Sequence, residues 1–346
     1  NDFMKIIYCS EPFYSNQPDY SYEKEAKAAQ ENGFEFELFS FEDLIENNIS
    51  SAFKRIKPCE EIQTAIYRGW MLKPKQYEIL YRELRSRNLI LINSPEEYRF
   101  CHHFPESYKV IKDFTPKSVI LPYGENFSFE KMHEKLSVFG DKPLILKDYV
   151  KSRKHEWHEA CFIESASNHQ KVEQIVNRFL ELQGDDLNEG LVFREFIEFQ
   201  PLTNHSKSGM PLTKEFRLFF LEGELIFSSE YWEEGKYETT ELPKDFFLEI
   251  AKKVKSNFFT MDIAQKTDGD WFIIELGDGQ VAGLPENADE MNFYQSFQFH
   301  PHELWRQDDN GHKFLIETFP CRADAVRAMK DFEAKLHKQT YWVETA

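Results

Sequence analysis

Cysteine is scarce in this chain of 346 residues. The five cysteines are scattered, and no two of them form a CxxC pair. Zinc sites and redox motifs use closely spaced cysteines, and disulfide-framed domains are short and rich in cysteine. The spacing therefore favours reduced thiols in a cytosolic protein over a disulfide frame or a zinc site.

Long apolar runs are also missing. No stretch approaches the roughly 18 apolar residues of a membrane span, and the N-terminus shows no signal-peptide pattern of basic, apolar and small residues. We therefore expect a soluble, cytoplasmic protein that does not bind membranes. Hydrophobic residues at 41% and 33 Phe suffice for a packed globular protein, and the length predicts two or three domains of roughly 150 residues.

Positive charge is in deficit, with a formal net charge of −18 at pH 7. Because a nucleic-acid backbone requires a basic surface, we do not expect nucleic-acid binding. The local exception is the segment KDYVKSRKHEW, which contains the cations Lys147, Lys151, Arg153 and Lys154. Clustered cations suit phosphate oxygens, and a solvated basic loop is the alternative. The segment lacks glycine, so it is not a glycine-rich phosphate loop.

Strands and helices alternate over the first hundred residues. Apolar and amphipathic segments follow one another at 4–9, 20–33, 34–40, 64–70, 75–87 and 88–93. This alternation predicts a parallel sheet with helical crossovers. Ligands of such sheets gather at the carboxyl ends of the strands, where Arg68, Gly69 and Asn93 lie.

The rest of the chain predicts mainly antiparallel strands. Strands are expected at 117–124, 142–150, 158–164 and 190–199, and hairpins at 214–232 and 258–285. Residues 287–299 are predicted to be a polar, irregular linker. Beyond them, a hairpin, a helix at 321–336 and a strand at 339–345 predict a small ββαβ module.

The hairpin at 258–285 presents the carboxylates Asp262 and Glu275 at facing ends of two apolar strands, and Asp278 follows three residues later. Mg²⁺ is usually held by one or two carboxylates together with substrate phosphates. An acidic rim on a surface hairpin is the alternative. Arg217 shares a predicted strand face with Glu215, which is unfavourable when buried unless the two pair or bind a ligand. Together with Lys147, these groups are what phosphate and Mg²⁺ require.

The order of several features resembles the ATP-grasp superfamily over residues 1–286. These features are Lys109, strand-end Lys147, the strands VFREFIEF and KEFRLFF, and Asp262 followed thirteen residues later by Glu275. KDYVKSRKHEW and IIELGDGQ resemble its clade named for an arginine and two lysines, of the family 3 type. The resemblance implies a pre-ATP-grasp domain, 1–104, and two lobes that clasp ATP, 105–198 and 199–286. The linker 287–299 and a SPOR-like module, 300–346, complete the predicted α/β and α+β architecture.

The resemblance also implies roles for individual residues. Lys109 and Lys147 would contact ATP phosphates, Glu195, Phe196 and Ile197 would line the adenine site, and Glu215 would hold the ribose. Arg217 would face the γ-phosphate or an acyl phosphate, and Asp262 and Glu275 would hold Mg²⁺. We add Lys151 and Lys154 of the basic loop as candidate catalytic cations and Asp278 as a candidate metal ligand.

One position departs from the superfamily. The common Glu-x-Asn at the last metal position is replaced by Glu275-Leu276-Gly277, so either Asp278 acts as a ligand or one metal ion is bound more weakly. The implied activity is an ATP-dependent carboxylate–amine ligase that forms a carbon–nitrogen bond, releases ADP and passes through an acyl phosphate. Its substrates would be small molecules, peptides or proteins. A phosphotransferase and an inactive nucleotide-binding or interaction protein are the alternatives, and the terminal module could dock a partner.

Overall fold

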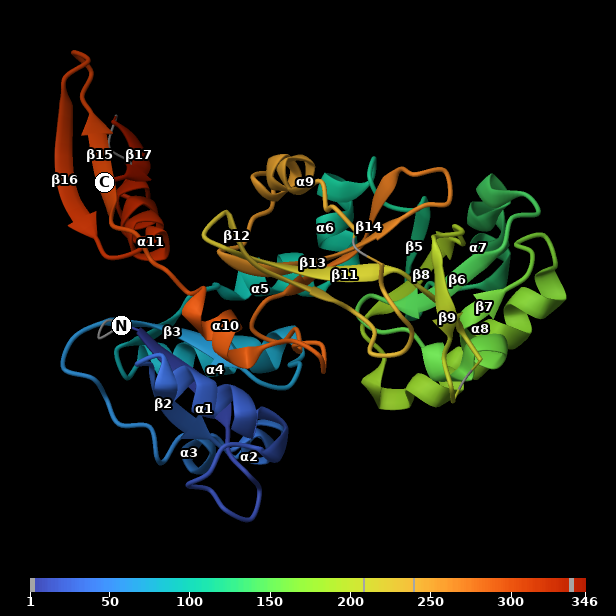
Figure 1. Cartoon of the computed structure of the whole chain (residues 1–346), viewed down its shortest axis with the longest axis horizontal. Coiled ribbons are helices and arrows are strands. Elements are labelled where there is room, and N and C mark those ends of the chain that lie inside the picture. Colours follow the sequence, from blue (N-terminus) through green and yellow to red (C-terminus); the bar gives the residue numbers. More distant parts are fainter. Residues whose placement is uncertain (1–3, 208, 239, 336–338) are drawn as a thin grey trace.

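The computed structural model describes residues 4–207, 209–238, 240–335 and 339–346 (Figure 1). Positions 1–3, 208, 239 and 336–338, which fall in the predicted domains, lie outside the described residues. Within the described residues, no helix combines the length and the apolar character needed to cross a bilayer.

The N-terminal part forms a parallel sheet in the order β2-β1-β3-β4, as the alternating segments predicted. Its strands are β1 (Met4–Cys9), β2 (Glu35–Phe39), β3 (Gln63–Arg68) and β4 (Leu89–Leu91). Its helical segments are η1 (Tyr20–Tyr22), α1 (Glu23–Glu31), α2 (Phe41–Ile45), α3 (Ile49–Ala52) and α4 (Pro74–Arg85). Pro74 begins α4. At this position a backbone N–H would have no partner within the helix, so proline loses no hydrogen bond there.

Helices α5 (Pro95–His102) and α6 (Phe104–Ile111) lead into an antiparallel sheet in the order β5-β8-β6-β7. Its strands are β5 (Ser118–Pro122), β6 (Leu144–Asp148), β7 (Phe162–Ile163) and β8 (Gly190–Glu195). The helical segments around it are α7 (Phe129–Leu136), η2 (Ser137–Phe139), η3 (Lys154–Glu156), η4 (Trp157–Cys161), α8 (His169–Gln183) and η5 (Gly184–Asp186). The strand predicted at 158–164 is therefore shorter than expected, because its first half forms the turn η4 and buries Cys161.

The third sheet has the order β12-β11-β13-β14 and is antiparallel. Its strands are β11 (Glu215–Leu221), β12 (Glu224–Glu230), β13 (Phe258–Gln265) and β14 (Trp271–Asp278). The other elements of this part are the strands β9 (Pro201–Asn204) and β10 (Pro211–Thr213) and the helix α9 (Lys244–Ala251). Glu222 and Gly223 both have positive φ angles, of 53° and 91°, which a two-residue hairpin turn of this type requires.

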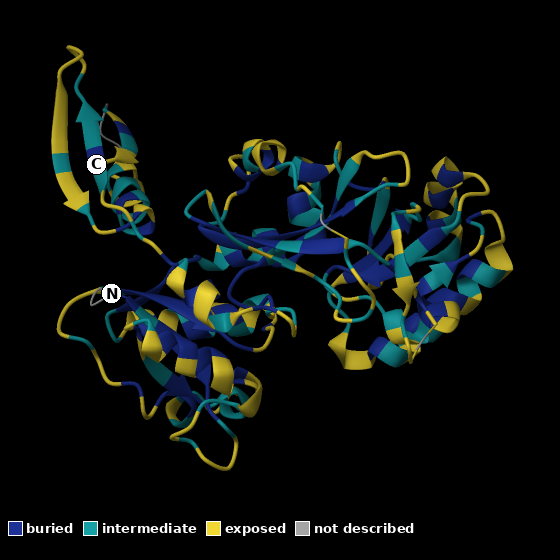
Figure 2. Ribbon diagram, viewed as in Figure 1, coloured by how far each residue is buried: buried dark blue, intermediate teal, exposed yellow. Residues whose placement is uncertain are grey.

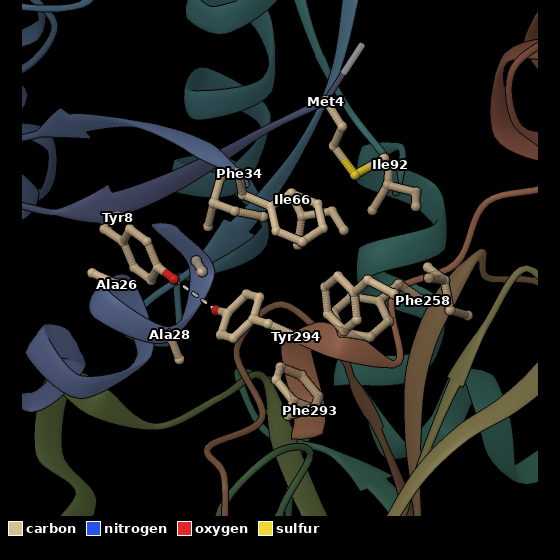
Figure 3. Packing of buried hydrophobic residues seen from close by; sticks show 14 of the residues in the cluster. Met4, Tyr8, Ala26, Ala28, Phe34, Ile66, Ile92, Phe258, Phe293 and Tyr294 are labelled. Carbon is tan, nitrogen blue, oxygen red and sulfur yellow. Dashed lines mark hydrogen bonds between the residues drawn. The ribbon is translucent and has the colours of Figure 1, made fainter. Parts of the chain in front are cut away.

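The segment predicted as a polar linker, 287–299, instead contains helix α10 (Glu290–Gln295). Phe293, Tyr294 and Phe297 are buried in one hydrophobic cluster with residues of the N-terminal sheet. Figure 3 shows Tyr294 beside Tyr8, and the two hydroxyl oxygens lie 2.6 Å apart. The aromatic side chains therefore decide the structure here, because their burial outweighs the polar residues between them.

The C-terminal module consists of β15 (His302–Gln307), β16 (Lys313–Phe319), α11 (Arg322–Glu333) and β17 (Thr340–Thr345). Its sheet has the order β16-β15-β17, and it lies beside the N-terminal sheet, away from α7 and α8 (Figure 1). The start of α11 joins it to the rest: Thr64 donates to Asp324 at 2.7 Å and the Ala323 N–H donates to Glu222 at 2.7 Å. Much of β16 is exposed (Figure 2).

Candidate functional site

Two cavities lie end to end along the same three strands. Side chains two residues apart on a strand share a face, and in β6 Ile145 borders the first cavity while Lys147 borders the second. In β11 the corresponding pair is Glu215 and Arg217. β14 likewise contributes to both. The first cavity has a volume of about 450 Å³ and the second of about 180 Å³.

The larger cavity is mostly apolar. It lies between the end of β8, the hairpin β9–β10 and the turn η4, and its lining includes Glu195, Phe196 and Ile197. Trp157, Met210 and Leu212 belong to one buried cluster on its wall. A mostly apolar cavity of this size suits the ring system of an organic ligand.

Two charged side chains stand where the larger cavity approaches the smaller one. Burial raises the pKa of Glu215, an effect that Lys154 and the hydroxyl of Thr213, 2.8 Å away, oppose. Lys154 places its ammonium 5.6 Å from the centre of the Trp232 ring. Burial would lower the pKa of Lys154, but Glu215 and its neighbours raise it above its usual value. Lys154 therefore remains a cation inside the site.

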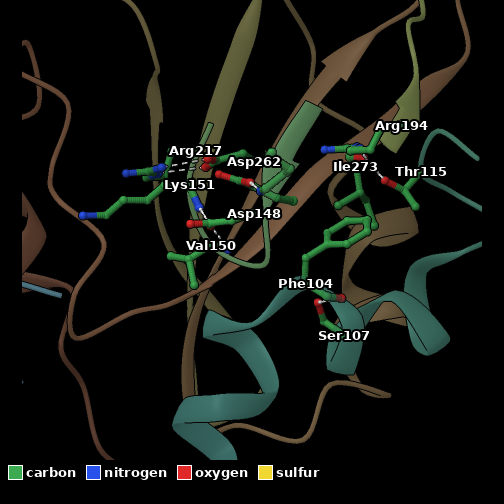
Figure 4. Close-up of polar contacts among 12 residues, drawn as sticks. Phe104, Ser107, Thr115, Asp148, Val150, Lys151, Arg194, Arg217, Asp262 and Ile273 are labelled. Carbon is green, nitrogen blue, oxygen red and sulfur yellow. Dashed lines mark hydrogen bonds and ion pairs between the residues drawn. The ribbon is translucent and has the colours of Figure 1, made fainter. Parts of the chain in front are cut away.

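The smaller cavity is built around two ion pairs. Arg217 donates from Nε and Nη2 to the two carboxylate oxygens of Asp262, at 2.8 and 2.7 Å (Figure 4). Lys147 donates to Glu275 Oε2 at 2.6 Å. Asp262 and Glu275 face each other across β13 and β14. The predicted cations and carboxylates thus meet at one place.

The basic loop after β6 is shaped by a carboxylate rather than by glycine. Asp148 is fully buried, and its Oδ1 accepts from the N–H groups of Val150 and Lys151 at 2.7 and 2.5 Å. Its Oδ2 accepts from Gln183 and Asn188. Lys151 is exposed on this loop, and the neighbouring Val150 borders the smaller cavity. The absence of glycine noted in the sequence is therefore compatible with a rigid loop.

Asp262 and Glu275 fit a Mg²⁺ ion that is also bound by phosphate. Both offer oxygen ligands, and two carboxylates with substrate oxygens are a usual set for this ion. Among the described residues, no group of three or more His, Cys, Asp or Glu side chains is placed to hold a metal by itself. The chemistry of the pair therefore fits a metal that arrives with a nucleotide.

Glu275 remains ionised in this site. Burial would raise its pKa, but the charges of Lys147 and Lys154 lower the pKa to about 2. A carboxylate with a lowered folded-state pKa adds stability above its unfolded pKa, near 4.3, and loses that contribution as the pH falls through about 2.

We therefore expect Glu275→Gln to weaken the dependence of stability on pH between about 4.5 and 2. Urea denaturation at a series of pH values measures the pH dependence of stability. Glu130→Gln, at an exposed position of α7, is the control. If the single change at Glu275 leaves the acid slope of the wild type intact, the charge interaction with Lys147 is not what keeps this carboxylate ionised.

Asp278 borders the same cavity, but the structure does not free it for a metal ion. Asp278 lies three positions after Glu275 in β14. Because side chains alternate along a strand, an odd offset directs it to the other face of the sheet. Asn93 donates to its Oδ2 at 2.7 Å and the Gln280 N–H donates to its Oδ1 at 2.9 Å. Burial raises its pKa to about 7, against these hydrogen bonds. Its oxygens join β14 to the N-terminal domain.

A local steric constraint explains why position 277 is a glycine. It pairs with Thr260 of β13, and a Cβ added at Gly277 would lie 2.7 Å from the Thr260 hydroxyl oxygen. That distance is too short for any larger side chain unless Thr260 moves. Thr260 therefore limits the side chain at position 277, and it borders the polar cavity.

Lys109 is not brought to either cavity in the described structure. It is exposed on α6, whereas the neighbouring Phe104 and Tyr108 face the sheet. Phe104 borders the polar cavity, and the Lys147 ammonium lies 5.5 Å from its ring centre. The helix therefore contributes an aromatic wall to the site and turns this lysine toward solvent.

Two residues of the site were not predicted. Arg194 is 7% exposed and borders the apolar cavity. It donates to Thr115 at 3.1 Å, and its Nε has no hydrogen-bond partner among the described residues. His102 borders the polar cavity, where burial lowers its pKa to about 3. The only signal for Arg194 was that it is the single basic residue in the segment GLVFREFIEF.

Residues 137–297 match the model of an ATP-grasp domain, family 3 of the clade named for an arginine and two lysines. None of the curated proteins matches the chain.

Several solved structures share the fold. The ATP-grasp ligase PsnB, complexed with minimal precursor, Mg and ADP, has a TM-score of 0.50 at 14% identity, covering 84% of this chain and 96% of that one. D-cycloserine synthetase DcsG has a TM-score of 0.53 at 12% identity, covering 85% and 97%. A RimK domain ATP-grasp protein from Sphaerobacter thermophilus DSM 20745 has a TM-score of 0.53 at 11% identity, covering 84% and 98%.

At these identities the likeness establishes the fold. It confirms the predicted class, a parallel-sheet domain followed by antiparallel sheets, whereas the SPOR-like character of the terminal module stays a prediction. The chain has the fold of the ATP-grasp proteins, and its residues 137–297 match the model of an ATP-grasp domain of family 3 in the clade named for an arginine and two lysines.

Proposed function

We propose that the protein is an ATP-dependent carboxylate–amine ligase that acts through an acyl phosphate. The observation that carries this proposal is the adjacency of the two cavities along β6 and β11, where an apolar cavity is followed by one containing two cations and two carboxylates. A nucleotide has the same two parts in the same order. The PsnB structure with Mg and ADP supports the choice of ATP and Mg²⁺.

The adenine ring is proposed to lie in the apolar cavity, against Glu195, Phe196 and Ile197, with the ribose at Glu215. The triphosphate would then extend along β6 and β11 toward Lys147 and Arg217. Lys154 lies on this path, as does Arg194. The unpartnered Nε of Arg194 supports the path, because a buried guanidinium favours an anionic partner.

Binding of phosphate would exchange the ion pairs of the smaller cavity. Lys147 and Arg217 would turn their donors from Glu275 and Asp262 to phosphate oxygens, which leaves the two carboxylates as metal ligands. Bound Mg²⁺ supplies neutralisation of the charge on the phosphate oxygens. Without nucleotide the charges of the two cations and the two carboxylates cancel, so the paired state is a suitable resting form.

The proposed reaction has two steps. An oxygen of the substrate carboxylate bonds to the γ-phosphorus as the bond to the β,γ-bridging oxygen breaks, which yields the acyl phosphate and ADP. The amine nitrogen then bonds to the acyl carbon, inorganic phosphate leaves, and the nitrogen loses a proton. Arg217 of the smaller cavity, together with Lys151 of the neighbouring loop, would hold the acyl phosphate oxygens, and no protein nucleophile is needed.

A peptide or protein is the proposed substrate. PsnB, which shares the fold, is described in complex with a precursor peptide and AMPPNP. The proposal extends that substrate class to this chain at the level of a carboxylate and an amine, of which at least one belongs to a polypeptide.

Incubation with ATP, Mg²⁺ and a pool of amino acids and peptides tests the function. ADP together with a conjugate lighter by one water than its two components is the expected result. A product heavier by one phosphate would instead indicate a phosphotransferase, and AMP release would contradict the acyl-phosphate route. Tight ATP binding without turnover of any pool member would identify an inactive nucleotide-binding protein.

A further inference from the structure

A third hollow, with a volume of about 850 Å³, lies outside the two cavities described above. We call it the interdomain groove. Its walls are the N-terminal turns of α4 and α5, the loop 187–189 after η5, and Lys330 of α11. It therefore touches the N-terminal domain, the sheet that contains Lys147 and the C-terminal module, and it shares no lining residue with the nucleotide cavities.

A buried histidine with unused hydrogen-bonding capacity borders the groove. His103 is 1% exposed, and neither ring nitrogen has a hydrogen-bond partner among the described residues. Glu189 Oε2 is 3.8 Å from its Nδ1, beyond hydrogen-bond distance. Burial lowers the pKa of His103, so its ring is neutral and offers one donor and one acceptor. Buried polar atoms of this kind are usually paired with protein, water or a ligand, and for His103 the groove is where such a partner would lie.

Charges of both signs surround this ring. Arg99 is held by Glu189 through two hydrogen bonds of 2.9 and 2.7 Å, and Lys73 donates to the Asp185 carbonyl at 2.7 Å. Lys330 lies 3.7 Å from Glu97. Among the described residues of the groove, the charged side chains without such a partner are those of Lys75, Glu78 and Glu96, which are exposed. Such a mixture is unsuited to a uniformly charged ligand.

The groove adjoins the polar cavity in two places. Met71 borders that cavity and Lys73 borders the groove, and two residues of extended chain span about 7 Å. His102 likewise borders the cavity while His103 borders the groove, with the Tyr149 ring 6.2 Å from that of His103. A ligand in the groove can thus present a group to Arg217 by passing the exposed Met71.

We propose that the interdomain groove binds a polypeptide segment of the substrate, whose reacting group enters the polar cavity past Met71. This inference rests on the proposed ligase function. A peptide group has one donor and one acceptor, which matches a neutral His103, and a polypeptide offers both charge signs to Lys75, Glu78 and Glu96. The volume exceeds the need of a single carboxylate and suits a few residues of chain.

A direct binding measurement tests the groove without requiring turnover. A fluorescein-labelled pool of random octapeptides is titrated with the full chain in the presence of AMPPNP and Mg²⁺, and fluorescence polarisation is followed. We expect His103→Leu and Lys75→Glu each to weaken binding about tenfold, a usual effect of losing one hydrogen bond or charge pair. Lys24→Glu, an equal charge change on exposed α1, is the matched control and should bind as wild type.

Lys75 is exposed, so its variant is expected to fold even if His103→Leu does not. Equal binding by wild type and Lys75→Glu, or no binding of the pool by wild type, would overturn the groove assignment. The two proposals fail separately: peptide-dependent ADP release that is insensitive to Lys75→Glu rejects the groove and keeps the ligase. Peptide binding sensitive to Lys75→Glu, without any ADP release, rejects the ligase and keeps the groove.

Discussion

Lys147→Met is expected to lower ATP turnover by about 100- to 1,000-fold, the usual effect of removing one preorganised donor from a site of developing negative charge. The ammonium of Lys147 is 5% exposed and is already fixed at 2.6 Å from Glu275 and over the Phe104 ring. It therefore needs little reorganisation to meet a phosphate oxygen. ADP release at saturating ATP and Mg²⁺ gives the measurement.

Lys142→Met provides a matched control. Lys142 belongs to the same sheet region and also donates to a glutamate, Glu195, at 2.6 Å, but its side chain is 57% exposed and outside the polar cavity. We expect turnover within a few-fold of wild type, because exposed ion pairs contribute about 1 kcal/mol or less. Equal losses in both variants, or normal turnover in Lys147→Met with its melting temperature unchanged, would remove Lys147 from the phosphate site.

A sequence pattern could predict the part of this site that lies on regular strands. Lys147, Arg217, Asp262 and Glu275 stand in apolar strands, where burial of a charge is unfavourable unless it is paired. Alternation then decides which of their neighbours share the face, and the same rule places Glu215 in the adjoining cavity. The ion pairs can then be inferred, because the opposite charges of their members are visible in the sequence.

The remaining site residues depend on packing between segments that are distant in sequence. Lys109 is one helix position away from Tyr108, which packs inward, so the orientation of α6 and not the residue type decides its exposure. Asp278 is engaged by Asn93, which is 185 residues away. Arg194 contacts Phe104 and Thr115, which are distant in the sequence, so its part in the site is not visible from its own segment. No local pattern contains these contacts.

The fold of residues 287–299 shows the same limit. Their polar composition predicts an irregular linker, yet Phe293, Tyr294 and Phe297 are buried against the N-terminal sheet. One consequence concerns Arg68, which is 0% exposed and lies 5.3 Å from the centre of the Phe293 ring. A charge at that depth requires a full set of partners.

Arg68 joins the N-terminal domain to the segment that holds Arg217. It donates to both carboxylate oxygens of Glu25 at 2.9 Å, and from Nη1 to the Gly279 and Ala282 carbonyls at 2.5 and 2.8 Å. The next carbonyl, that of Gly283, accepts from Arg217 at 2.9 Å. Two arginines thus bind neighbouring carbonyls of one turn, and we propose that Arg68 positions Arg217 without touching a nucleotide.

Arg68→Met is expected to destabilise the protein by about 3–5 kcal/mol, because it leaves Glu25 buried and unpaired. The double variant Arg68→Met/Glu25→Met should regain much of that stability, since neither charge then remains without its partner. Urea denaturation measures both. The turn at Ala282 stays unanchored in the double variant, so its ATP turnover should still be lower by up to about 100-fold, the effect of a displacement near 1 Å.

The two readouts separate positioning from stability. A double variant that is stable and turns over ATP at the wild-type rate would show that Arg68 serves the fold alone. If stability returns while turnover stays low, the loss is independent of folding, and the half-saturating ATP concentration locates it. Because Arg217 is proposed to lie at the reacting end of the nucleotide, that concentration should change less than the maximal rate, which would assign to the N-terminal domain a part in the geometry of the reaction.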